Sequence, residues 1–132
     1  VVWGSDLVVD SASEIARTFG MSERFIGLTI VAFGTSLPEL VTSVTAAKSG
    51  NVGIAIGNIV GSNIFNILFV IGTTALICNV PFESKFLIDS AVAVAAGIIL
   101  WLGTIKNKEL RRPCGIIMLL AYAGYFAYLC MN

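Results

Sequence analysis

The sequence contains no histidine and few charged residues. Of its 132 residues, 12% are charged and 57% are hydrophobic, and the mean hydropathy is +0.92. About a quarter of the residues of a soluble domain are charged, so this composition nearly excludes a water-soluble globular fold. Eight basic residues balance eight acidic ones, which leaves no basic surface for nucleic acid. Without histidine the commonest catalytic base is missing, and we expect no enzymatic activity.

Cysteine is also scarce. The three cysteines, Cys78, Cys114 and Cys130, are odd in number, far apart and set in or beside apolar runs. This spacing fits neither a disulfide framework nor a zinc site. We therefore expect them to act as small packing residues.

The few charges are distributed so as to leave long apolar stretches. No charged residue occurs over 49–82, 90–105 or 113–132, and residues 25–47 contain only Glu39. A bilayer core requires about 20 apolar residues as helix, so each stretch can hold one span. With an entering helix over residues 1–20, the sequence predicts an all-α, polytopic membrane helix bundle of about five transmembrane helices.

The entering helix carries a charged stripe, formed by Asp6, Asp10, Glu14 and Arg17 at helical spacing. The stripe fits a solvated face near the membrane surface or a water-lined face of a cavity, and the sequence does not separate the two. Gly20 is typical of a helix C-terminus and Ser22 of the next N-cap. The chain begins with Val1 in an apolar segment that does not resemble a signal peptide, so we expect it to be the later part of a longer polytopic protein.

One loop predicts the orientation in the membrane. Residues 106–112 contain four of the eight basic residues, and short loops rich in Lys and Arg stay cytoplasmic. Counting spans from this loop places the turn at 49–51 inside, loops 20–24 and 79–86 outside, and the C-terminus outside. We expect an integral multi-pass protein of the cell membrane, plasma or inner, whose surroundings are the lipid bilayer.

Polar residues inside spans are costly and are functional by default. The first group lies around Gly34, Thr35, Ser36, Pro38 and Glu39. Pro38 deprives the Gly34 carbonyl of its helical donor, which predicts a kink there. The two hydroxyls lie three and four residues before Glu39 and hence on its face. The sequence predicts an oxygen-rich patch with one negative charge near the bilayer midplane.

The second group lies in the next span. Asn58, Ser62 and Asn66 recur every four residues and form one polar stripe, and glycines at the same interval, Gly53, Gly57 and Gly61, form an adjacent smooth one. Glycines at this spacing allow close helix packing, so we expect this helix to approach the Glu39 helix. Oxygen ligands without His or Cys suit hard cations, above all calcium and sodium. Polar residues that merely link helices are the competing interpretation.

The segments over 27–40 (GLTIVAFGTSLPEL) and 57–66 (GNIVGSNIFN) resemble the alpha-repeat of the sodium/calcium exchangers, in the cation/calcium antiporter superfamily. The motif covers about residues 20–78, and Leu37 before Pro38 favours the second of two repeats. The resemblance implies that residues 1–132 are the C-terminal half of a ten-helix exchanger made of two inverted halves.

The resemblance further implies an antiporter that exchanges Ca²⁺ for Na⁺ by alternating access, without a cofactor, at a midplane site shared with the other half. The implied ligands are Ala32, Thr35, Ser36, Glu39, Ser62 and Asn66. Potassium-dependent relatives place Asp where Asn66 stands, which argues against potassium co-transport. One carboxylate is too little for a divalent ion, so the other half, or a second copy, must supply more. A Ca²⁺/H⁺ antiporter and a non-transporting half-module remain alternatives.

Overall fold

The computed structural model describes residues 2–132, and every regular element among them is helical. The chain divides into two compact units, one ending at Val80 and the other beginning at Pro81. Each unit is considered by itself.

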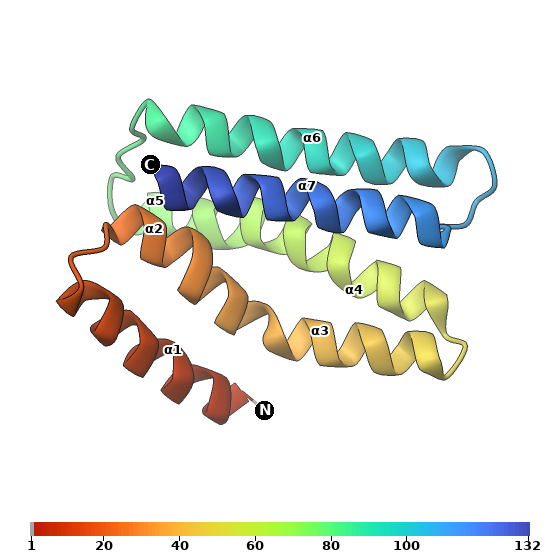
Figure 1. The fold of residues 1–132 in the computed structure, drawn as a ribbon, viewed down its shortest axis with the longest axis horizontal. Helices are drawn as coiled ribbons and strands as arrows, with labels where there is room; N and C mark the ends of the chain where they lie inside the picture. The colour runs from red at the N-terminus through yellow and green to blue at the C-terminus, as the bar shows by residue number, and fades with distance from the viewer. Residues whose placement is uncertain (1) are drawn as a thin grey trace. The chain divides into compact units, whose positions relative to one another are not determined.

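The first unit contains α1 and two long helices that each include a π-helical segment (Figure 1). Helix α1 is Val2–Thr18. The first long helix consists of α2 (Glu23–Ile26), a π-helical segment (Gly27–Val31) and α3 (Ala32–Lys48). The second consists of α4 (Val52–Ile64), a π-helical segment (Phe65–Val70) and α5 (Ile71–Ile77). Helices α3 and α4 pack against each other, and α1 packs against α3.

The second unit is a pair of helices, α6 (Lys85–Ile105) and α7 (Arg112–Met131). The basic 106–112 loop joins them at one end. The Tyr125 hydroxyl of α7 donates to the Asp89 carboxylate of α6 over 3.0 Å, a polar link near the other end of the pair. All three cysteines are free thiols, and Cys78 and Cys130 are exposed.

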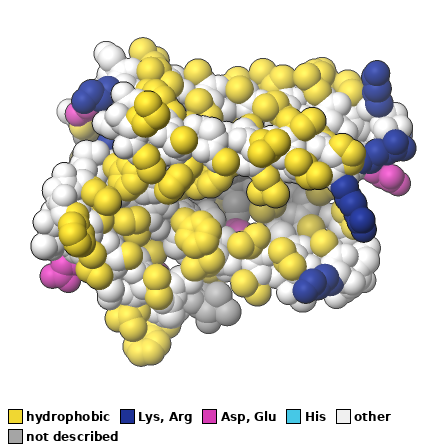
Figure 2. Space-filling model, in the orientation of Figure 1, with side chains coloured by type: hydrophobic (Ala, Val, Ile, Leu, Met, Phe, Trp, Pro, Cys, Tyr) yellow, Lys and Arg dark blue, Asp and Glu magenta, His cyan; other side chains and the backbone are white. Residues whose placement is uncertain are grey.

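The lengths and exposure of the helices fit a membrane. Four helices, over 23–48, 52–77, 85–105 and 112–131, are long and apolar enough to cross a bilayer. Large apolar side chains on them are exposed, for example Leu76 at 89% and Leu119 at 71%. In Figure 2 hydrophobic side chains cover much of the visible face, and Lys and Arg lie at helix ends. The predicted all-α polytopic bundle is confirmed, with four candidate spans plus α1.

The predicted punctuation between helices is also confirmed. Gly20 and Gly50 have φ of +77° and +80°, a left-handed conformation that glycine adopts without steric cost. The Ser22 hydroxyl accepts a hydrogen bond from the Phe25 N–H over 3.2 Å and so caps α2. These turns reverse the chain twice and bring α1, α3 and α4 into one unit.

The closest packing in the first unit is between α1 and α3, at Gly34. Gly34 is buried, and a Cβ atom added there would overlap Cγ2 of Val9. The face of α1 turned inward is made of small residues, with Ser5, Ser13 and Ala16 all buried. Small residues let helix backbones approach closely where apolar burial gives little driving force.

We expect Gly34→Ala to destabilise the α1–α3 contact. Overpacking typically costs about 1–3 kcal/mol, more than the roughly 1 kcal/mol that alanine gains over glycine in a helix. The melting temperature of the purified protein should fall, and Val9→Ala should restore it by removing the overlapping methyl. Gly57→Ala, which meets only open space among the described residues, is the control. Equal melting temperatures for Gly34→Ala and Gly57→Ala would contradict this packing.

The kink expected at Pro38 stays a prediction, because the backbone is assigned as α-helix on both sides of it. Helix α3 continues as an α-helix through Pro38, and the π-helical segment lies earlier, over Gly27–Val31. A proline removes one backbone hydrogen bond, and a membrane helix tolerates that loss when neighbouring groups compensate. The sequence shows the proline but not this widened turn before it.

Candidate cation site

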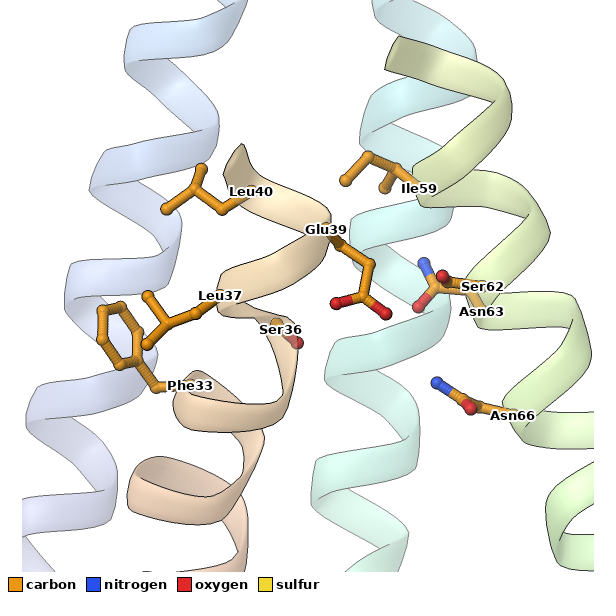
Figure 3. Close-up of a pocket in the computed structure, with 9 residues that line it drawn as sticks. All are labelled: Phe33, Ser36, Leu37, Glu39, Leu40, Ile59, Ser62, Asn63 and Asn66. Carbon is orange, nitrogen blue, oxygen red and sulfur yellow. The ribbon is translucent and has the colours of Figure 1, made fainter. Parts of the chain in front are cut away.

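A cavity of about 290 Å³ lies between α3 and the second long helix, centred on Glu39. Its polar lining comes from both helices: Ser36 and Glu39 from α3, Ser62 and Asn63 from α4, and Asn66 from the following π-helical segment. Figure 3 shows the Glu39 side chain pointing across the gap toward Ser62 and Asn63, with Phe33, Leu37 and Leu40 on the other side of α3. The cavity therefore has an oxygen-rich wall on each side.

The Glu39 carboxylate has an unsatisfied oxygen. Its Oε2 atom is buried and has no hydrogen-bond partner among the described residues. A buried carboxylate oxygen without a donor is costly, and such a group in a native protein calls for a water or an ion. No Lys or Arg lies in the cavity lining. The site is thus negatively charged, and its charge is not compensated by the residues that line it.

Four of the six residues expected as ligands line this cavity, namely Ser36, Glu39, Ser62 and Asn66. The other two do not line it: Thr35 lies one turn and Ala32 two turns before Glu39 on α3. The Thr35 hydroxyl is 2.9 Å from the Val31 carbonyl oxygen and 3.2 Å from that of Ala32. Its hydrogen is directed to the backbone, which leaves the hydroxyl lone pairs as the available donors to an ion.

Asn58 has a different role from the rest of its stripe. Its Nδ2 donates to the Glu39 carbonyl oxygen over 3.3 Å and to Ser43 Oγ over 3.2 Å. Ser43 Oγ in turn donates to the Ala55 carbonyl of α4 over 3.4 Å. These bonds tie α4 to α3 one turn from the cavity. The structure therefore supports a role for Asn58 and Ser43 in linking the two helices.

The glycine stripe was expected to let α4 pack closely against α3, and this expectation is wrong for the contact between these two helices. A Cβ added at Gly53, Gly57 or Gly61 would meet no atom of the described residues within 4 Å. Gly57 and Gly61 directly precede Asn58 and Ser62, so they lie about 100° around the helix from them. Because α4 turns its polar stripe toward α3, the glycine stripe faces elsewhere. In the first unit the glycine with a close neighbour is Gly34, against Val9 of α1.

Asn63 lines the cavity but was not among the expected ligands. A strict four-residue repeat selects Ser62 and Asn66 and passes over Asn63, although an amide in an apolar span is itself a signal. Asn66 follows the end of α4, where the helix widens into its π-helical segment. Such segments occur frequently at functional sites. This one sets the direction of Asn66 in a way that a 3.6-residue period does not describe.

The cavity has too few charges to neutralise a divalent ion. Among residues 2–132, no group of three or more carboxylate, thiol or imidazole side chains is placed to hold a metal, and Glu39 is the only carboxylate in the lining. Neutral oxygens can complete the coordination of calcium or sodium, but they supply no charge. Within this chain the site is a one-carboxylate oxygen cluster.

Comparison with known proteins gives the family. The model of the family described as sodium/calcium exchanger protein matches residues 1–131. The chain is 40% identical over 130 residues to sodium/calcium exchanger MaX1 of Methanosarcina acetivorans, covering 98% of this chain and 37% of that protein. It is 34% identical over 130 residues to inner membrane protein YrbG of Escherichia coli, covering 95% of this chain and 38% of that protein.

A shorter match is to a relative whose name includes potassium. The chain is 49% identical over 63 residues to sodium/potassium/calcium exchanger 2 of Homo sapiens, covering 48% of this chain and 10% of that protein. No solved structure matches the chain. The chain spans less than two fifths of the length of MaX1 and YrbG. Its helices and its match over residues 1–131 make it an integral membrane protein, and the chain belongs to the sodium/calcium exchanger family.

Proposed function

We propose that this chain forms half of a secondary antiporter that exchanges Ca²⁺ for Na⁺ across a membrane by alternating access. The transported ions are the substrates and occupy the cavity around Glu39. In this proposal the ligands are Glu39, Ser36, Ser62 and Asn66, together with the Ala32 carbonyl and Thr35. No resident cofactor takes part, and the reaction makes or breaks no covalent bond.

The observation that carries the proposal is the buried Oε2 of Glu39, which has no donor among the described residues. A structural carboxylate would be expected to accept hydrogen bonds, because an unpaired charge in an apolar medium is costly. A cation in the 290 Å³ cavity would compensate it directly. All the remaining polar lining consists of hydroxyls and amides, which are ligands of hard cations.

The charge count implies a second half. One carboxylate leaves a calcium ion with a net charge of about +1 inside the membrane, which is expensive. We propose that a complementary half, in the same longer chain or in a second copy, contributes at least one more carboxylate to the site. Transporters built from two inverted halves bind their ions at the interface of those halves. Rocking of one half against the other would then open the site to each side in turn.

A cation/H⁺ antiporter is the second candidate, because the same carboxylate could carry a proton in place of sodium. Completed protein reconstituted in vesicles separates the two. We expect an outward-directed sodium gradient to drive uptake of radioactive calcium, and a pH gradient in sodium-free buffer to drive none. Uptake driven by the pH gradient alone would favour the proton-coupled antiporter. Vesicles with this chain alone test whether the half transports by itself, and we expect no uptake.

The membrane orientation is a further prediction. The basic 106–112 loop between α6 and α7 is expected in the cytoplasm, with the C-terminus outside, and the cell membrane is the expected location. A single cysteine introduced as Asn107→Cys into a Cys-free background should resist an impermeant maleimide in intact cells and react after permeabilisation. A cysteine in place of Asn132 should react in intact cells. The reverse pattern would invert the topology.

A further inference from the structure

A second hollow lies on α1, and it shares no lining residue with the cavity around Glu39. We call this space, which has a volume of about 530 Å³, the α1 hollow. Its lining consists of Val9, Asp10, Ser13, Glu14, Arg17 and Val31. Five of these residues belong to α1, and Val31 ends the π-helical segment before α3. Three residues of the charged stripe of α1 line the hollow, and all four stripe residues are exposed, so both sequence interpretations stay predictions.

The α1 hollow is acidic. Asp10 and Glu14 are four residues apart and therefore project from the same face of the helix. Arg17 is the only basic residue in the lining, but Glu23 outside the hollow engages it. Arg17 Nε lies 2.8 Å from Glu23 Oε1, and Arg17 Nη2 lies 3.2 Å from Glu23 Oε2. This bidentate pair engages the guanidinium. Arg17 also interacts electrostatically with Glu14, though the two do not form an ion pair, and neither Asp10 nor Glu14 has an ion pair with a described residue.

Ser13 provides the second observation. It lines the hollow between the two acidic residues in the sequence and is only 4% exposed. Its Oγ is buried and has no hydrogen-bond partner among the described residues. A buried hydroxyl that bonds neither the backbone nor another side chain is unusual in a native protein. Ser13 and the two exposed acidic residues line the same hollow.

We propose that the α1 hollow is a second, weaker cation site, in which Asp10 and Glu14 hold a hydrated divalent cation and Ser13 contributes its hydroxyl oxygen. Calcium takes six to eight oxygen ligands, so three side chains leave the ion most of its water. A dissociation constant on the order of 10⁻⁴–10⁻³ M is typical of such sites. The identity of the natural ion as calcium rests on the proposed function, whereas the binding itself does not.

The position of the hollow indicates a function for the proposed cation site. The Val31 carbonyl on its wall accepts the hydrogen bond of Thr35, and Thr35 precedes Ser36 of the Glu39 cavity. Val31 is thus the one lining residue of the α1 hollow that lies on the same long helix as Ser36 and Glu39. A charged recess raises the local concentration of oppositely charged substrate and so speeds its capture. The α1 hollow would collect cations beside the transport site.

Direct binding of Mn²⁺ to the completed exchanger, followed by electron paramagnetic resonance, tests the site. All measurements use the Glu39→Gln background, which removes the transport site from the titration. We expect this background to keep a weak Mn²⁺ site, and Asp10→Asn with Glu14→Gln to weaken it at least tenfold. Each single substitution should weaken it less than the pair does, and Ser13→Ala should weaken it by about threefold.

Asp6→Asn is the matched control, because Asp6 is exposed on the same helix but does not line the hollow. We expect it to change Mn²⁺ affinity by less than twofold. The proposal is overturned if the paired substitution leaves Mn²⁺ binding unchanged, or if Asp6→Asn weakens binding as much as Asp10→Asn does. Transport is not part of this readout, so a failure of calcium exchange and a failure of the α1 site are distinguishable.

Discussion

Glu39→Gln is expected to abolish sodium-driven calcium flux in the completed two-half protein. The substitution keeps the shape of the side chain and removes the only carboxylate of the cavity lining. It also removes a charge that costs roughly 2.5–3.5 kcal/mol at the middle of a membrane helix. Membrane insertion and the melting temperature without ions should therefore be unchanged or improved. A loss of transport without a loss of stability is the signature of a ligand.

Thermal unfolding provides an independent measurement of the same residue. A ligand at a concentration of 100 times its dissociation constant stabilises the folded state by about 2.7 kcal/mol, so calcium should raise the melting temperature of the unmodified protein. This rise should disappear in Glu39→Gln. Glu109→Gln removes the same charge from the exposed loop between α6 and α7 and should leave both the rise and the flux intact. If Glu39→Gln exchanged calcium at near-normal rates, Glu39 would be structural and the cavity would not be the transport site.

The sequence predicted the helices well because their limits are set by chemistry that a single sequence displays. The charge-free runs and the turn residues at Gly20, Ser22 and Gly50 define where each helix begins and ends, and the structure follows them closely. The two π-helical segments were not predicted. A π-helical turn depends on how neighbouring helices pack, and the residues of Gly27–Val31 carry no periodic signal for it.

For the candidate site, residue type was more informative than periodicity. Glu39 is the one acid within residues 25–47, and its Oε2 is buried without a hydrogen-bond partner among the described residues. The four-residue repeat placed Asn58 with Ser62, although Asn58 bonds the backbone of α3, and it missed Asn63. The direction in which an amide points depends on the crossing of two helices and on the widened turn at Phe65, which a pattern along one helix does not specify.

Asn66→Asp is expected to change the ion requirement of transport. Asn66 lines the cavity that contains Glu39, and an aspartate there would bring a second carboxylate from this half to the same ion. The family resemblance of the sequence implies Asp at this position in potassium-dependent exchangers, and this expectation gives the direction of the change. The unmodified protein should exchange calcium for sodium equally well with and without potassium. The variant should require potassium, or should hold calcium so tightly that turnover falls at least tenfold.

Calcium uptake into vesicles with and without potassium, together with calcium binding to the same preparations, separates these results. A tighter dissociation constant with slower uptake indicates a trapped ion, because a tenfold gain in affinity corresponds to about 1.4 kcal/mol that must be overcome on release. Asn63→Asp is the control, since Asn63 lines the same cavity and lies three residues before Asn66. If potassium dependence needs a carboxylate at one particular place, Asn66→Asp acquires it and Asn63→Asp does not. Strict potassium dependence of the unmodified protein would instead mean that the amide of Asn66 suffices, and that the missing charge comes from the other half.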